Sequence, residues 1–219
     1  INLERQLNLQ TLQRQREDPF QLAHDQLREL LYGQGPYGHD PLGVEAELRS
    51  ISRDQLSEQA TRLGSQGAVM VLAGAIPSEA EAWIGAGLGD TPWRTNAPQR
   101  CHGPRGAAMG EFAAGVDDTE QLVLMLGCTT TALGAADALA LRLLHCHLGV
   151  GMSSRLFVAL REHKGLAYDV GVHHPARLGD APFVFHLSSS SERAAEACSA
   201  LLDEWSLLLN TPISQDELA

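Results

Sequence analysis

The chain has 219 residues, 44% of them hydrophobic, and a formal net charge of −11 at pH 7. This length allows one large domain or two modest ones, and the negative charge argues against nucleic acid or an anionic membrane as a partner. The four cysteines lie far apart without a CxxC pair, which is typical of reduced thiols in a cytoplasmic protein. No apolar run is long enough to span a bilayer, so we expect no membrane segment.

The first 88 residues read as a series of helices followed by a strand and a last helix. Asp18-Pro19 ends the first helix, because the residue before proline avoids the α region. Ser52 and Gln55 form a capping box that starts another. The apolar run GAVMVLAG, residues 67–74, predicts a buried strand. Apolar residues at helical spacing and start signals predict helices over residues 2–17, 20–32, 44–50, 53–63 and about 77–86.

The composition of the sequence changes between Gly87 and Gly106. Glycine and proline are dense there and apolar periodicity is lost, which is typical of a linker. The alternative interpretation is that the arginines of this stretch form a ligand-binding patch. We therefore predict one domain over residues 1–88, a linker over 89–105, and a second domain over 106–219.

The second domain reads as strands and helices in the order β-β-α-α-β-β-α. Lys164-Gly165 ends the second helix, with glycine supplying the left-handed residue, and Ser190 or Ser191 caps the last one. This order predicts an α+β fold with a mainly antiparallel sheet. The expected strands are residues 111–116, 120–129, 166–174 and 182–189, and the expected helices are residues 132–148, 154–163 and 191–209.

The last residues of the chain carry a helix start signal. Ser214 and Glu217 form an S-x-x-E capping box, and only two residues follow. A helix that starts there is cut short, so we expect a fragment of a longer protein. A disordered tail is the alternative interpretation.

Several patterns that suggest metal or phosphate sites are weak. His145 and His147 point about 200° apart on a helix, and His173 and His174 face opposite sides of a strand. Neither pair can act as a chelate, and neither HExxH nor HxxEH occurs. The turn GVGMSSR could hold a phosphate at a helix N-terminus, but its serines can equally cap that helix.

Arg161 and Tyr168 stand seven residues apart, one on the last turn of a helix and the other on the returning strand. A glycine turn between them can bring both side chains to one surface. Arginine offers planar donors to a carbonyl or carboxylate group, and the tyrosine offers a phenolic donor. The pair could hold a peptide carbonyl; a surface arginine and a half-buried strand tyrosine are the alternative.

The stretch GMSSRLFVALREHKGLAYDV resembles the signature of the insulinase/pitrilysin (inverzincin) superfamily of zinc peptidases, processing-protease type. The stretch GPYGHDPLG, the helix that follows it, and AVMVLAG resemble the preceding part of the family pattern, in the same order. The resemblance implies an α+β fold of repeated α/β units, each with a mainly antiparallel sheet flanked by helices. Residues 1–88 would be the back half of one unit, and residues 106–219 the truncated front part of the next.

The resemblance also implies where zinc would bind. The HxxEH motif of the family lies in the front half of a unit, upstream of this chain. The third zinc ligand of the family is a glutamate, and the match of LERQLNLQTLQ at Glu4-Arg5 puts Thr11 at its position. Threonine is a poor zinc ligand, and Glu17 lies too far along the helix to substitute. No metal is therefore expected in this chain, and zinc is expected in a partner or an upstream unit.

In many bacterial peptidases of this family, a zinc-free subunit contributes an Arg/Tyr pair that binds substrate beside a zinc-bearing partner. Arg161 and Tyr168 match that pair in type and spacing. The resemblance thus implies a non-catalytic subunit or half that binds peptide substrate and completes a zinc metalloendopeptidase, and that is inactive alone. The alternatives are an active zinc peptidase with HxxEH upstream, a structural core-type member, and an unrelated α+β binding module. Exposed sheet edges make self-association possible.

Overall fold

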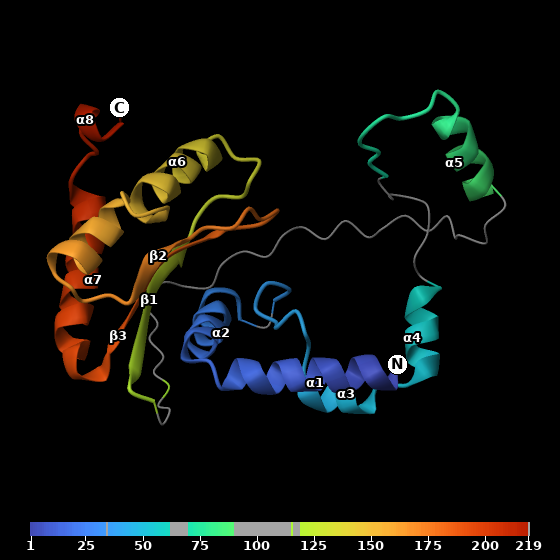
Figure 1. Ribbon diagram of the computed structural model, residues 1–219, viewed down its shortest axis with the longest axis horizontal. Coiled ribbons are helices and arrows are strands. Elements are labelled where there is room, and N and C mark those ends of the chain that lie inside the picture. Colours follow the sequence, from blue (N-terminus) through green and yellow to red (C-terminus); the bar gives the residue numbers. More distant parts are fainter. Residues whose placement is uncertain (34, 62–69, 90–114, 116–118, 219) are drawn as a thin grey trace. The chain divides into compact units, whose positions relative to one another are not determined.

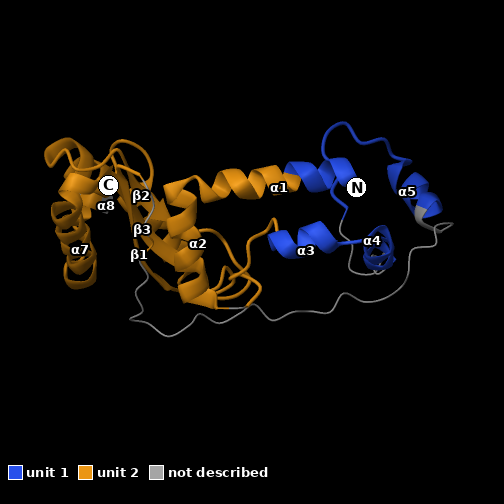
Figure 2. Ribbon diagram, turned by 90° about the horizontal axis from the view of Figure 1, so that it is seen from below, with its two compact units in different colours: residues 1–7, 44–101 blue, residues 8–43, 102–219 orange. Residues whose placement is uncertain are grey.

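The structure is a computed structural model of the chain, and it describes all residues except 34, 62–69, 90–114, 116–118 and 219. Two compact units are present: residues 1–7 with 44–101, and residues 8–43 with 102–219 (Figure 2). Almost all of the predicted linker, and most of the strand predicted over 111–116, lie outside the described residues. The domain boundaries at 88 and 106 rest on the sequence alone and stay a prediction.

The first unit contains the helices α3 (Glu45–Ser50), α4 (Arg53–Ala60) and α5 (Ala80–Gly89), and the first residues of α1 (Asn2–Arg16). The predicted capping box starts α4: the Ser52 hydroxyl accepts from the Gln55 N–H, and the Gln55 side chain accepts from the Ser52 N–H. The Arg5 side chain donates to the Ile51 carbonyl and so ties α1 to the segment after α3.

The buried strand predicted over residues 67–74 is wrong for the part that the structure describes. Residues 70–73 form neither strand nor helix, and Val71 is 82% exposed. An apolar run forms a buried strand only when neighbouring strands take its backbone hydrogen bonds and cover its side chains. The described part of the first unit contains helices and irregular segments but no strand that could pair with it.

A three-stranded antiparallel sheet organises the second unit. The strands β1 (Gln121–Thr129), β2 (Asp169–His173) and β3 (Pro182–Ser190) lie in the order β1-β3-β2. Leu126 and Val172 both stand opposite Phe185 of the central strand. β2 and β3 form the predicted hairpin. The combination of this sheet with surrounding helices is the predicted α+β fold.

Helices cover both faces of the sheet (Figure 1). Successive side chains of a strand point to opposite faces, so Phe183, Phe185 and Leu187 face one side, and Val184 and His186 face the other. The first side packs against α6 (Ala138–Gly149), the helix over Phe157–His163, and α7 (Ala194–Asn210). The second side packs against α2 (Pro19–Tyr32), whose Phe20 ring meets the His186 ring edge-on.

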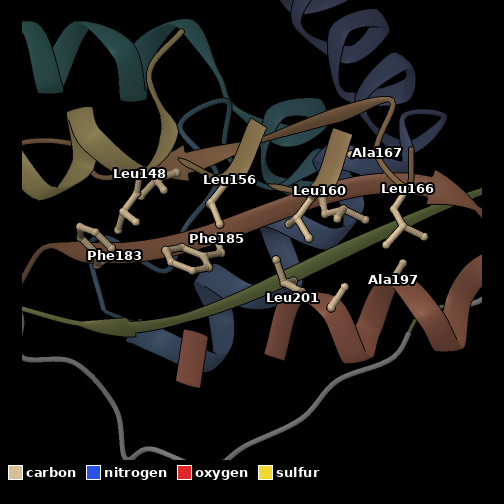
Figure 3. Close-up of a cluster of buried hydrophobic side chains, with 12 residues drawn as sticks. Leu148, Leu156, Leu160, Leu166, Ala167, Phe183, Phe185, Ala197 and Leu201 are labelled. Atoms are coloured by element: carbon tan, nitrogen blue, oxygen red, sulfur yellow. The ribbon is translucent and has the colours of Figure 1, made fainter. Parts of the chain in front are cut away.

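The main core lies between β3 and the helices of the first side (Figure 3). Leu156, Leu160, Phe185 and Leu187 are fully buried there. Phe185 also meets Trp205 of α7, with ring centroids 4.9 Å apart. The remaining buried members of this cluster are Leu148, Leu166, Ala167, Val172, Phe183, Ala197, Ala200 and Leu201.

Three helix predictions need correction in detail. α6 begins at Ala138 and not at residue 132, because residues 132–137 form turns in which the Leu133 N–H donates to the Arg177 carbonyl. The second short helix is wider than expected, a π-helix over Phe157–His163. Ser190 precedes a 3₁₀ turn (Ser191–Arg193) that leads into α7, without a capping bond from its side chain. The predicted box at Ser214 and Glu217 is present and starts α8 (Gln215–Leu218).

Candidate functional site

The turn between the π-helix and β2 brings Arg161 and Tyr168 together. Gly165 takes a positive φ of 59°, which glycine adopts without steric cost, so the predicted glycine stop is confirmed. The Gly165 N–H donates to the Arg161 carbonyl, and the Leu166 N–H donates to the Leu160 carbonyl. These two bonds close the helix and turn the chain back into the sheet, where the Tyr168 N–H donates to the Ser188 carbonyl at 2.8 Å.

Arg161 contacts the backbone of Tyr168 and not its ring. Its Nη1 donates to the Tyr168 carbonyl at 2.6 Å, and its guanidinium carbon lies 5.2 Å from the centre of the Phe157 ring. Both residues are exposed, Tyr168 by 64%. Within the described part of the chain the Tyr168 hydroxyl has no hydrogen-bond partner. An arginine has five N–H donors, so Arg161 and Tyr168 together present further donors to solvent at one place.

A second group of polar residues lies under α2 and was not identified from the sequence. His24 of α2, His173 of β2 and His186 of β3 line a cavity of about 280 Å³ with Phe20, Gln21, Met125, Val172 and Val184. The rings of His24 and His173 meet edge-on at 5.2 Å, and the Nδ1 atom of His186 lies 3.4 Å from a carboxylate oxygen of Asp169. The alternation of side chains along β2 and β3 was the signal that could have placed His173 and His186 on one face of the sheet. The sequence gives no sign that α2 covers this face.

Burial lowers the pKa of all three imidazoles. It lowers the pKa of His173 to about 4, with further contributions from His24, Arg177, His186 and His145. Burial also lowers the pKa of His24, aided by Arg28 and opposed by Asp25. It lowers the pKa of His186, where Asp169 opposes the effect. The folded chain therefore holds these rings in the neutral form at pH 7.

These shifts predict that the chain loses stability in mild acid. In the unfolded chain these histidines take up protons near pH 6.5, whereas in the folded chain they do so only at lower pH. The free energy of unfolding is therefore highest above about pH 6.5 and falls as the pH drops toward 4. Urea unfolding is expected to show that the free energy of unfolding is lower at pH 5 than at pH 7.5 by on the order of 1 kcal/mol because of His173. Solvent screening of its partly buried ring keeps the effect this small. His173→Gln should reduce this pH dependence, and His39→Gln, at an exposed histidine, should not. Equal pH dependence in all three proteins would contradict the prediction.

The members of each histidine pair singled out in the sequence, His145 with His147 and His173 with His174, have different neighbours. The Nε2 atom of His145 lies 3.1 Å from the Val172 carbonyl oxygen, whereas His147 lies near Glu217 of α8. The Nδ1 atom of His174 lies 2.9 Å from the Pro182 carbonyl oxygen, whereas the ring of His173 meets that of His24. Among the residues that the structure describes, no three histidine, cysteine or acidic side chains come together in a set that could hold a metal ion.

Thr11 is an exposed residue of α1. Its side chain supplies a neutral hydroxyl, which is a poor match for the anionic or imidazole donors that zinc prefers in proteins. The donor set in the described part of the chain therefore does not fit a zinc ion. The assignment of Thr11 to the third-ligand position rests on the alignment with the family pattern and stays a prediction.

Residues 50–219 match the family model described as Peptidase M16 inactive domain. The chain belongs to this family. The match confirms the insulinase/pitrilysin superfamily predicted from the signature. Among the described helices, none is long and apolar enough to cross a membrane.

Relatives of this inactive domain include proteins named as zinc proteases. An uncharacterized zinc protease of Mycobacterium leprae is 31% identical over 174 residues, which cover 78% of this chain and 39% of that protein. The crystal structure of a peptidase M16 inactive domain from Pseudomonas fluorescens shares the fold, with a TM-score of 0.79 and 23% identity over 99% of this chain and 53% of that chain. A protease from Helicobacter pylori also shares it, with a TM-score of 0.80 and 19% identity over 98% of this chain and 53% of that chain. The chain thus spans about half or less of the length of each.

Proposed function

We propose that this chain is part of a zinc-free subunit or half that binds peptide substrate and completes a zinc metalloendopeptidase. The observation that carries the proposal is the placement of Arg161 and Tyr168 on one exposed turn in a chain of the inactive-domain family. In this proposal the zinc, the attacking water and the general base belong to a homologous partner or to an upstream unit. The chain alone is inactive. A cytoplasmic location stays a prediction; the described cysteines, Cys128, Cys146 and Cys198, are free thiols.

The chemistry of the pair suits a peptide carbonyl. A guanidinium donates to oxygen atoms in a planar fork and keeps its charge at any physiological pH. Arg161 donates one N–H to the Tyr168 carbonyl, and its other N–H groups are available to a substrate. That intramolecular bond fixes the direction of the fork. The Tyr168 hydroxyl adds a donor on the same surface. Together they would hold the substrate chain in one orientation while the partner attacks it.

The first test uses the full-length protein and its homologous zinc-bearing partner. The protein alone is expected to contain no zinc and to leave fluorescein-labelled casein peptides uncut, and cleavage is expected when the partner is added. Arg161→Ala is expected to lower cleavage by the pair of proteins about 10- to 100-fold, since a hydrogen bond from a charged group is worth about 1.5–3 kcal/mol. Tyr168→Phe should have a smaller effect in the same direction.

The control is Arg142→Ala, which removes an exposed arginine on α6 and should leave cleavage unchanged. About one zinc per chain together with cleavage by the protein alone would contradict the proposal and identify the protein as a peptidase itself. Cleavage that needs the partner but does not respond to Arg161→Ala would favour a structural role for this chain.

A further inference from the structure

The turn that carries the proposed substrate-binding pair is held by side chains from outside it. Three consecutive carbonyl groups accept hydrogen bonds there. Nη1 of Arg193 donates to the Gly165 carbonyl at 2.6 Å, and its Nη2 donates to the Lys164 carbonyl at 3.3 Å. The Ser189 hydroxyl, which is buried, donates to the Leu166 carbonyl at 2.7 Å.

The turn needs such donors because the carbonyls at the end of a helix have no partners within it. The positive φ of Gly165 reverses the chain, and the Lys164 and Gly165 carbonyls both accept from Arg193. A guanidinium fork can reach two acceptors at once, which an ammonium group cannot do with the same fixed geometry. The residues on either side, Leu160 and Leu166, are anchored in the core (Figure 3).

Arg193 is itself fixed in place. It ends the 3₁₀ turn (Ser191–Arg193) between β3 and α7. A single carboxylate oxygen of Glu196 accepts from its Nε at 3.1 Å and from its Nη2 at 3.0 Å. The guanidinium fork therefore approaches the turn in a set direction.

We propose that Arg193 is a positioning residue for Arg161 and Tyr168. The inference rests on the proposed function and adds a residue to it. Arg193 bonds the first half of the turn, at Lys164 and Gly165, and Arg161 bonds its far end, at the Tyr168 carbonyl. Without Arg193 the Lys164 and Gly165 carbonyls lose their side-chain donor, so the first half of the turn is held less tightly and the Tyr168 ring no longer keeps one position relative to the Arg161 fork. Arg193 itself does not touch the substrate.

The test observes Tyr168 directly and peptide binding separately. Fluorotyrosine labelling of the full-length protein gives a ¹⁹F signal for each tyrosine, and Tyr168→Phe assigns the signal of Tyr168. Arg193→Ala is expected to shift or broaden that signal and to leave those of Tyr32 and Tyr37 in place. Affinity for fluorescein-labelled casein peptides, measured by anisotropy, is expected to fall about tenfold. Arg193→Lys should restore part of the Tyr168 signal and part of the peptide affinity. Arg142→Ala should change neither the Tyr168 signal nor the peptide affinity.

Two results would overturn the positioning role. One is a Tyr168 signal that Arg193→Ala leaves unchanged in a protein that circular dichroism shows to be folded. The other is a peptide affinity that Arg161→Ala lowers and Arg193→Ala does not. If Arg161→Ala itself leaves peptide affinity unchanged, the proposed function fails, whatever Arg193 does to the Tyr168 signal.

Discussion

Replacing Phe185 by alanine is expected to lower the free energy of unfolding by about 3–5 kcal/mol, a typical cost of emptying a buried aromatic site. Phe185 is fully buried on the central strand. Its ring meets Trp205 edge-on and lies 6.3 Å from the ring of Phe183. The substitution removes apolar burial and both aromatic contacts, and strands on both sides of β3 hinder collapse of the cavity.

Urea unfolding of the 219-residue chain, followed by circular dichroism, measures this effect. The matched control is Leu178→Ala in the hairpin loop, where the side chain is 82% exposed; a change within about 0.5 kcal/mol is expected there. Similar midpoints for the two variants would show that Phe185 is not at the centre of the core, and that the sheet does not pack against α7 as described.

Local signals in the sequence were sufficient for most helices and for the turn at the candidate site. Asp18, whose side chain accepts from the Phe20 N–H, starts α2 before Pro19. Ser52 starts α4 through its capping box. Gly165 ends the π-helix with a positive φ. Each of these features depends on residues within four positions of one another, so they can be read from the sequence without knowledge of the fold.

Features that depend on contacts between distant segments were missed. The π-helix over Phe157–His163 was not expected, because π-helices are rare and occur mostly as single turns inside α-helices. The beginning of α6 at Ala138 reflects the bond between Leu133 and Arg177. The group of His24, His173 and His186 requires α2 to lie over the sheet. The strand predicted at residues 70–73 is absent for the same reason, because a strand forms only where neighbouring strands pair with it.

The candidate site combines both kinds of information. The spacing of Arg161 and Tyr168 around a glycine is visible in the sequence, and the structure adds the bond between the Arg161 side chain and the Tyr168 carbonyl. Arg193 lies 25 or more residues away from both, and no local pattern connects it to them. Its part in the site appears only when the hairpin of β2 and β3 returns the chain to the turn.

Replacing Gly149 by alanine is expected to destabilise the chain by about 3 kcal/mol, at the upper end of what overpacking usually costs. Gly149 is the last residue of α6, where the helix meets β2. A Cβ atom at this position would lie 2.4 Å from the Val172 backbone nitrogen and 2.7 Å from the Val172 Cβ. Backbone atoms cannot rotate away, so α6 or β2 must shift.

The matched control is Gly134→Ala, because a Cβ atom there would meet nothing within 4 Å and the residue has no positive φ; its effect should stay within about 0.5 kcal/mol. Urea unfolding of both variants measures the difference, and equal midpoints would mean that α6 and β2 do not approach as closely as described. β2 begins directly after Tyr168, and Tyr168 bonds the central strand through its N–H. A shift of β2 would therefore also move Tyr168 relative to Arg161, and Gly149→Ala should weaken peptide binding without altering either residue of the pair.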